Sequence, residues 1–167
     1  MRFLLVDKIL SLEPGKRIVT IKALSLAEEY LADHFPIFPV LPGVMMIESM
    51  VQAAAWLVRI EQDFAKSVIV LRSARNVRYS SFVAPGSFLR CELEAVSIGE
   101  DAATFKGVGF VGDVQAVSGR LELKCFNLAD GGSGWRAEAD AAIVAQEKLR
   151  FRLVGGPEML AGARATP

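Results

Sequence analysis

The chain has 167 residues, of which 52% are hydrophobic, and its 19 Lys and Arg residues balance its 19 Asp and Glu residues. This hydrophobic content excludes an intrinsically disordered chain, and the length suits one domain better than two independent cores. A net charge of zero argues against a general nucleic-acid binder, which would carry a basic face, although a local basic patch stays compatible with it.

The first strands and the segment after them can be read in chain order. Strands are predicted at 3–12 and 17–23, joined by a turn at 13–16 with Pro-Gly at its centre. In 34–43, prolines recur every third residue, which predicts an extended, polyproline-like path. A helix follows from 44 to about 60, and because it is apolar around nearly its whole circumference it must be covered on most sides.

From residue 67 the hydrophobic period is two, which is typical of strands. Strands are predicted at 68–71, 88–98, 104–111 and 114–126, and the last three suit an antiparallel meander. Two strands, one buried helix and several long strands together predict an α+β fold, an antiparallel sheet wrapped around a central buried helix.

The remainder of the chain has a different character. A flexible connector at 129–134 precedes a predicted helix at 135–149, a short strand at 150–154 and a frayed end. We therefore divide the chain into a domain at 1–127 and a C-terminal extension at 128–167.

The start of the chain, its longest apolar run and its two cysteines lead us to expect a cytoplasmic protein. The apolar start contains Asp7 and has no small-residue cleavage site, unlike a signal peptide. The longest apolar run, 40–58, is interrupted by Pro42, Gly43, Glu48 and Gln52, which favours a buried helix over a membrane span. Cys91 and Cys125 lie in alternating apolar runs and are expected to be buried.

Two side chains carry the candidate chemistry. His34 is the only histidine, and a lone histidine is more often structural than catalytic. Glu48 is more informative because it lies in the most apolar helix, where a carboxyl group needs a partner or its own proton. Gln52, one turn further on the same face, could supply that hydrogen bond. The alternative is a polar stripe that faces water.

The start of the predicted helix adds a third element. Backbone N–H groups at Gly43 and Val44 lie in the first turn, where helical donors have no intrahelical acceptor. Such donors could bind a carbonyl oxygen as negative charge develops on it. Gly43 also allows a ligand to approach its backbone closely.

The segment His34-Phe35-Pro36-x-x-Pro39-x-x-Pro42-Gly43-Val44-x-x-x-Glu48-x-x-x-Gln52 resembles the active-site motif of the FabZ-type 3-hydroxyacyl-[acyl-carrier-protein] dehydratases. The acid is Glu, as in the FabZ type, whereas the FabA type has Asp there. The resemblance covers about residues 3–126, including the turn at 13–16 and a second Pro-Gly turn at 82–87.

This resemblance implies a hot-dog fold and a side-by-side homodimer, often a trimer of dimers, with His34 of one subunit facing Glu48 of the other. It implies that His34 removes the proton next to the thioester carbonyl, while the Gly43 amide binds the carbonyl oxygen. Glu48 would protonate the departing hydroxyl, with Gln52 orienting it. The product would be a trans-2-enoyl thioester of fatty-acid, lipid or polyketide synthesis, and no metal or redox cofactor is expected.

The partner implied by the resemblance is an acyl carrier protein, which is acidic. Arg72, Arg75 and Arg78 are candidates for docking it, and a solvated charged edge is the alternative. Four apolar side chains are candidates for an acyl tunnel, although core packing is the commoner role of methionines in a helix: Phe38, Met45, Met46 and Met50.

The chain departs from the motif at two positions, which marks it as a divergent member. Asp33 and Ile37 flank the His-Phe-Pro triplet where the family usually has glycines. Asp33 could stabilise a protonated His34, and Ile37 could reshape the tunnel entrance. Two alternatives to the dehydratase follow: a non-catalytic acyl-binding hot-dog subunit, which the altered glycines favour, and a hot-dog thioesterase.

Overall fold

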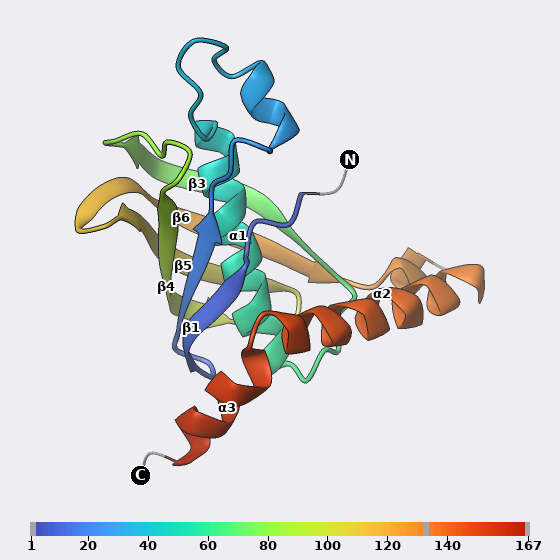
Figure 1. Cartoon of the computed structure of the whole chain (residues 1–167). Coiled ribbons are helices and arrows are strands. Elements are labelled where there is room, and N and C mark those ends of the chain that lie inside the picture. Colours follow the sequence, from blue (N-terminus) through green and yellow to red (C-terminus); the bar gives the residue numbers. More distant parts are fainter. Residues whose placement is uncertain (1–2, 132–133, 166–167) are drawn as a thin grey trace.

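The computed structural model of the chain describes residues 3–131 and 134–165, and Figure 1 shows their arrangement. The described strands are β1 (Lys8–Glu13), β2 (Arg17–Ala23), β3 (Val68–Tyr79), β4 (Phe88–Ile98), β5 (Ala102–Val111) and β6 (Val114–Phe126). The described α-helices are α1 (Gly43–Glu61), α2 (Gly134–Leu153) and α3 (Gly156–Ala165), and short 3-10 helices are η1 (Glu29–Ala32) and η2 (Leu128–Gly131).

The strands form one antiparallel sheet in the order β1-β2-β4-β5-β6-β3. The predicted meander is confirmed, because β4 pairs with β5 and β5 with β6. β2 pairs with β4, and β3 returns from α1 to pair with β6. The sheet curves around α1 (Figure 1), as the sequence predicts, and leaves β1 and β3 as its two edges.

The central helix is buried because the sheet and the C-terminal tail cover it from different sides. Its residues 53–58 are all buried. On the sheet side, a Cβ atom at Gly107 of β5 would lie 2.9 Å from the sulfur of Met50, so glycine permits this close approach. On the tail side, the rings of Trp56 and Phe151 have centroids 5.8 Å apart.

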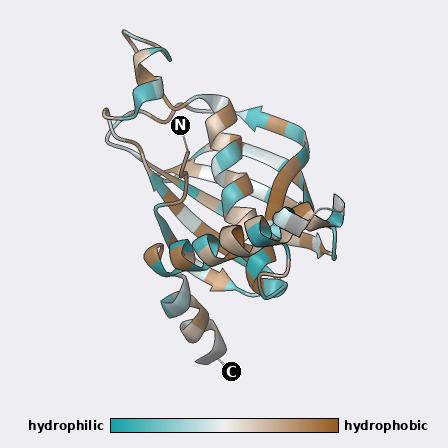
Figure 2. Cartoon of the chain, turned by 90° about the vertical axis from the view of Figure 1, so that its right-hand side faces the viewer, coloured by the Kyte–Doolittle hydropathy of each residue, from teal (hydrophilic) through white to brown (hydrophobic). Residues whose placement is uncertain are grey.

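The same helix has the length and hydropathy of a membrane span, but its surroundings are those of a core helix. Of its most apolar window, 61% is buried inside the protein. Coloured by hydropathy, α2 carries both hydrophobic and hydrophilic residues where it crosses α1 (Figure 2). The prediction of a buried helix in place of a membrane span is therefore confirmed.

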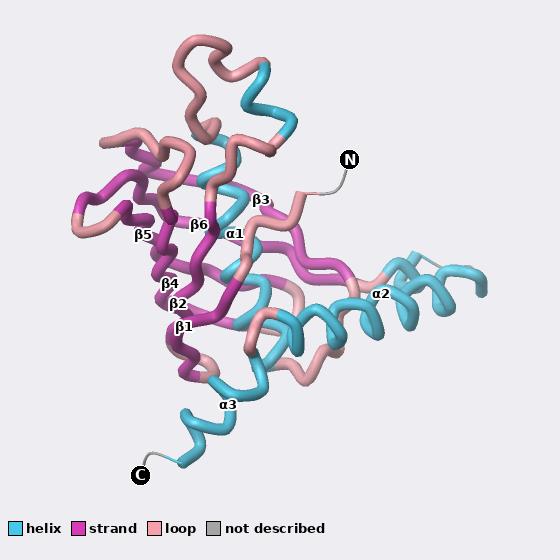
Figure 3. The backbone as a smooth tube through the Cα atoms, in the orientation of Figure 1, coloured by secondary structure: helices cyan, strands magenta, loops and turns pink. Residues whose placement is uncertain are grey.

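The proline-rich segment before α1 differs from the prediction. Residues 35–38 form a tight turn, in which the Phe38 N–H donates to the Phe35 carbonyl oxygen at 3.0 Å. Pro36 occupies the second position of this turn, where its fixed φ angle is favourable. The extended, polyproline-like path is thus wrong for this part. The loop projects beyond the N-terminal end of α1 (Figures 1 and 3).

Two further predictions need correction. β3 continues to Tyr79, eight residues beyond the predicted strand at 68–71, because an edge strand can carry polar side chains that break the apolar alternation. The predicted strand at 150–154 is not formed: α2 continues to Leu153. The end of the chain, predicted as frayed, forms α3, and residues 166–167 lie outside the described part.

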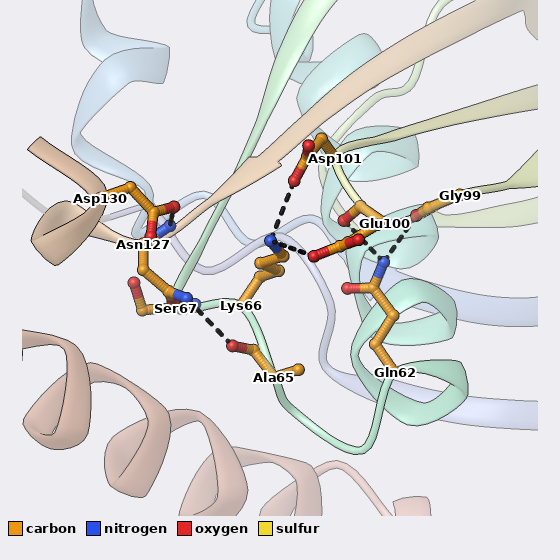
Figure 4. A network of polar contacts seen from close by, with 9 residues as sticks. All are labelled: Gln62, Ala65, Lys66, Ser67, Gly99, Glu100, Asp101, Asn127 and Asp130. Carbon is orange, nitrogen blue, oxygen red and sulfur yellow. Dashed lines mark hydrogen bonds and ion pairs between the residues drawn. The ribbon is translucent and has the colours of Figure 1, made fainter.

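Polar contacts fix the beginning of the tail to the rest of the fold (Figure 4). The Ser67 N–H donates to the Asn127 side-chain oxygen at 2.9 Å, and Asn127 donates in turn to the Ala65 carbonyl at 3.3 Å. Nearby, Lys66 pairs with Asp101 at 2.9 Å in the β4–β5 turn. The start of β3 and the end of β6 are therefore held together where the tail leaves the sheet.

Asp140 of α2 completes this anchor. Its carboxylate accepts a hydrogen bond from the Ser67 hydroxyl and bonds of 2.9 Å from the N–H groups of Leu128 and Ala129. Burial alone would raise the pKa of Asp140, but these hydrogen bonds outweigh it and hold the pKa below its ordinary value. The division at 127/128 remains a prediction, although the tail is firmly packed on the fold.

Candidate active site

The N-terminal end of α1 offers free backbone donors. Pro42 precedes the helix without a side-chain cap, and its carbonyl accepts from the N–H groups of Met45 and Met46. Among the described residues, no hydrogen bond is made by the N–H groups of Gly43 and Val44. They remain available to an oxygen that carries negative charge.

Gly43 is constrained by a neighbour that the sequence did not identify. A Cβ atom at Gly43 would lie 2.9 Å from two ring carbons of Tyr79, at the end of β3. The aromatic ring therefore packs directly on the helix start, and only glycine leaves room for it. Half of the Tyr79 side chain remains exposed beside the candidate donors.

His34 is half-buried on the loop before α1, with its ring stacked on that of Phe35. Its Nδ1 lies 3.2 Å from the carbonyl oxygen of Val40. Since a carbonyl oxygen only accepts hydrogen bonds, this contact assigns the proton of the neutral ring to Nδ1. The lone pair of Nε2 is then free to take up a proton.

Glu48 is held by the residue one turn further along α1. Gln52 donates from Nε2 to Glu48 Oε1 at 2.9 Å, as predicted. Gln52 is itself fixed by the N-terminal segment: its Nε2 also donates to the Phe3 carbonyl at 3.1 Å, and its Oε1 accepts from the Leu5 N–H at 2.9 Å. Its amide orientation is therefore fully determined.

The second carboxyl oxygen of Glu48 has no hydrogen-bond partner among the residues that the structure describes. The side chain lines a cleft of about 290 Å³ that runs along α1 and is bounded by the N-terminal segment, Ile69 of β3 and the C-terminal part of α2. The arrangement leaves Oε2 free to hold and transfer a proton at the cleft wall.

Within one chain, His34 and Glu48 do not form a single site. No hydrogen bond or ion pair joins them in the described part of the chain, and His34 does not line the cleft beside Glu48. His34 lies on the projecting loop, whereas Glu48 lies on the helix.

The other predicted site residues lie in several places. Met46 and Met50 are fully buried in the core, Met45 is half-buried against it, and Phe38 is exposed with its ring 5.5 Å from that of Phe82. The alternative of core packing therefore describes Met46 and Met50, and their tunnel role remains a prediction.

The charged candidates are all on the surface. Arg72 pairs with Glu122 of β6 at 3.0 Å, while Arg75 and Arg78 are exposed further along β3. Asp33 forms no ion pair with His34 among the described residues, and Ile37 is 99% exposed at the tip of the loop. The docking role of the arginines stays a prediction.

The cysteines take the predicted positions. Cys91 and Cys125 are free and buried. Burial raises the pKa of the Cys91 thiol to about 12, so this group stays protonated at neutral pH and is a poor nucleophile.

Sequence reasoning missed the residues of the cleft that come from outside the motif. Phe3 lines the cleft, and the backbone N–H of Leu5 fixes Gln52, which also lines it. The sequence gives no signal for such backbone contacts. Arg59, Glu147 and Arg150 line the far part of the cleft. A signal existed for Arg59, because it lies eleven residues after Glu48 and thus on the same helical face.

Comparisons with known proteins identify the family of the chain. A FabA-like domain matches residues 1–120. The 3-hydroxyacyl-[acyl-carrier-protein] dehydratase FabZ of Symbiobacterium thermophilum is 39% identical over 127 residues, which cover 76% of this chain and 89% of the relative. The FabZ protein of Clostridium kluyveri is 33% identical over 119 residues, or 71% and 83% of the two chains.

Solved structures support the fold. The dehydratase heterocomplex ApeI:P from Xenorhabdus doucetiae matches with a TM-score of 0.62 at 22% identity, over 75% of this chain and 85% of that one. The PaaI protein of E. coli, from the phenylacetic acid degradation operon, matches with a TM-score of 0.53 at 11% identity, over 70% and 81%. These likenesses support the hot-dog fold, and the sequence matches show that the chain belongs to the FabZ-type 3-hydroxyacyl-[acyl-carrier-protein] dehydratases of the FabA-like family.

Proposed function

We propose that the chain dehydrates 3-hydroxyacyl thioesters carried by acyl carrier protein, with His34 as the base and Glu48 as the acid. The observation that carries this assignment is the fixed carboxyl group of Glu48, which Gln52 holds through Oε1 and which belongs to a side chain that lines a cleft. The free Nε2 of His34 supplies the complementary proton acceptor.

The proposed reaction balances with these two groups alone. Nε2 of His34 removes the proton on C2, next to the thioester carbonyl, and the electron pair of the broken C–H bond forms the C2–C3 double bond. The C3–O bond breaks, and the departing hydroxyl takes the proton of Glu48 to leave as water. The N–H groups at Gly43 and Val44 hold the carbonyl oxygen while it carries negative charge. Proton transfer from His34 to Glu48, directly or through water, restores both groups.

We further propose that the complete site forms in a homodimer, which could assemble into a trimer of dimers. Two neighbouring loops expose apolar side chains that a partner would cover: the loop before α1 carries Phe35, Ile37 and Phe38, and the loop between β3 and β4 carries Phe82. A cluster of this kind is typical of an interaction surface. A partner that covers it would bring His34 of one chain to the cleft of the other.

The carrier protein would approach from the surface that bears Arg72, Arg75 and Arg78, because an acidic partner needs local cations and the net charge of the chain is zero. Arg75 and Arg78 are the better candidates, since Arg72 already pairs with Glu122. We place this activity in the cytoplasm, where acyl carrier protein would be available as the partner.

The experiment that tests the proposal uses His34→Ala and Glu48→Gln, assayed separately with a 3-hydroxybutyryl thioester. Each variant should lose activity by about 10²- to 10⁴-fold, the usual contribution of a positioned acid or base. Glu61→Gln, at the exposed end of the same helix, is the matched control and should keep full activity. If the wild-type chain released free thiol without an enoyl product, it would be a thioesterase. If the wild-type chain gave no reaction at all, an acyl-binding subunit would be favoured.

Mixing the two inactive variants tests the shared site. In a mixed dimer, one site combines an intact His34 with an intact Glu48. With random subunit exchange, about one quarter of all sites regain both groups, so about a quarter of the activity should return. If each subunit held its own complete site, mixing would restore nothing.

A further inference from the structure

One stripe of α1 runs the length of the cleft beside Glu48. Glu48, Gln52, Trp56 and Arg59 follow one another at helical spacing and all line the cleft. From Glu48 to Arg59 the helix rises about 16 Å, at 1.5 Å per residue. The cleft therefore begins at the proposed acid and extends away from it along the helix.

The middle of the cleft is apolar. Its walls there include Val51 and Ala55 of α1, Ile69 of β3 and Leu4 and Val6 of the N-terminal segment. Apolar walls with a polar reactive group at one end suit a hydrocarbon chain attached to a reactive thioester.

The far end of the cleft is charged. Arg59 lies over the Trp56 ring at 5.3 Å, and its guanidinium is 3.9 Å from the Glu147 carboxylate. Glu147 also accepts a hydrogen bond from Arg150. All three side chains are at least four-fifths buried, and each takes part in an ion pair.

Two of these three residues come from outside the family domain. The family match ends at residue 120, within β6, whereas Glu147 and Arg150 lie on α2. Phe151 of the same helix packs on Trp56 and places this part of α2 across the end of the cleft. Both ribbon views show α2 passing the C-terminal half of α1 (Figures 1 and 2).

We propose that the tail closes the acyl channel at this charged end and thereby restricts the enzyme to short acyl chains. The inference rests on the proposed function, because it takes the cleft beside Glu48 as the acyl channel. A long chain would bring its methyl end against Arg59, Glu147 and Arg150. Buried charged groups lose more by giving up their hydrogen bonds than a methyl group gains by burial. The cleft, with a volume of about 290 Å³, is also small for an extended ligand.

The test compares kcat/KM for 3-hydroxybutyryl and 3-hydroxydecanoyl pantetheine thioesters. The wild-type chain should prefer the shorter substrate. Arg150→Ala removes one charged side chain from the end of the cleft and leaves Glu147 paired with Arg59, so the fold should be retained. The variant should raise kcat/KM for the decanoyl substrate about tenfold, at the lower end of what one methylene group contributes in an apolar pocket. The ratio of the decanoyl to the butyryl kcat/KM is the quantity compared, because it cancels any effect that is common to both substrates.

Arg152→Ala is the matched control, because Arg152 lies on the same helix but is exposed and does not line the cleft. It should leave the ratio of the two substrates unchanged. A wild-type preference for the decanoyl substrate would overturn the inference, as would an equal shift in both variants.

A binding measurement separates this inference from the proposed reaction. In a Trp135→Phe background, Trp56 is the remaining tryptophan and reports on the cleft by fluorescence. The butyryl thioester should bind more tightly than the decanoyl one, and Arg150→Ala should reverse or remove that order. If binding shows this dependence on chain length while no substrate is dehydrated, the proposed reaction is wrong and the inference that the tail closes the channel is supported. If dehydration occurs without chain-length selection in either assay, the inference that the tail closes the channel is wrong and the proposed reaction is supported.

Discussion

The two edges of the sheet are protected in different ways. At β1, the chain covers its own edge: the Ile9 N–H donates to the Val154 carbonyl at 2.8 Å, and α3 packs alongside the strand. β1 is also short and carries a bulge between Ile9 and Ser11. These are features by which proteins prevent unwanted pairing at a sheet edge.

At β3, the opposite edge is long and open. Leu71 pairs with Leu123 of β6, which is fully buried, so both side chains point to the α1 side of the sheet. Leu71 is nevertheless 36% exposed, because nothing in the described part of this chain lies beyond it. An inward-facing apolar side chain at an uncovered edge is a surface that the proposed homodimer would cover. The contrast teaches that the tail blocks one edge and leaves the other for the proposed dimer.

The largest effect is expected from removing the packing that holds the tail over the fold on the β1 side. Phe151 is buried between Trp56 and Phe64. Phe151→Ala should lower the free energy of unfolding by about 3–5 kcal/mol, the usual result of removing a buried phenyl ring. Urea unfolding measures the loss. Leu149→Ala, exposed on the same helix, should change stability by about 0.5 kcal/mol or less. Similar losses in both variants would mean that the tail contributes little to the fold.

A smaller effect is expected at the open edge. Leu71→Asp places a charge where the proposed partner strand would lie, and the apolar contact of a leucine is lost. The dissociation constant of the dimer should rise at least about tenfold, since burying a leucine contributes about 1.5–3 kcal/mol. Sedimentation at several protein concentrations measures it. Val96→Asp, on β4 away from the edges, is the control. An unchanged dissociation constant for Leu71→Asp would place the dimer contact elsewhere.

The core and the motif could be predicted from the sequence because local patterns determine both. The strands β4 to β6 alternate with a period of two, and the segment of α1 is long enough and apolar enough around its circumference to predict a buried helix. The contact of Gln52 with Glu48 follows from helical spacing alone. These features need no knowledge of distant contacts.

The remaining features depend on contacts between distant segments. The hydrogen bonds between the Gln52 side chain and the N-terminal segment use backbone groups that every residue has, so no sequence pattern marks them. The polar end of β3 lacks the alternation of apolar and polar residues because an edge strand is open to solvent along its unpaired edge. The prediction of a strand at 150–154 is wrong because the apolar residues there contact α1 and β1, and a short apolar run does not distinguish a strand from the end of a helix.

The smallest effect is expected at the polar anchor of the tail. The carboxylate of Asp140 is stabilised by three hydrogen bonds, which keep its pKa below the ordinary value of 3.8. Its contribution to stability is therefore complete above that ordinary value and is lost as the pH falls through the lower pKa of the folded state. Asp140→Asn removes this titration. The unfolding free energy of the wild-type chain should accordingly fall more steeply than that of the variant below about pH 4. Urea unfolding at several pH values measures both slopes, with the exposed Glu138→Gln on the same helix as the control. Parallel slopes would show that the tail is held by its apolar contacts alone, and the shielding of β1 would then rest on Phe151 and its neighbours.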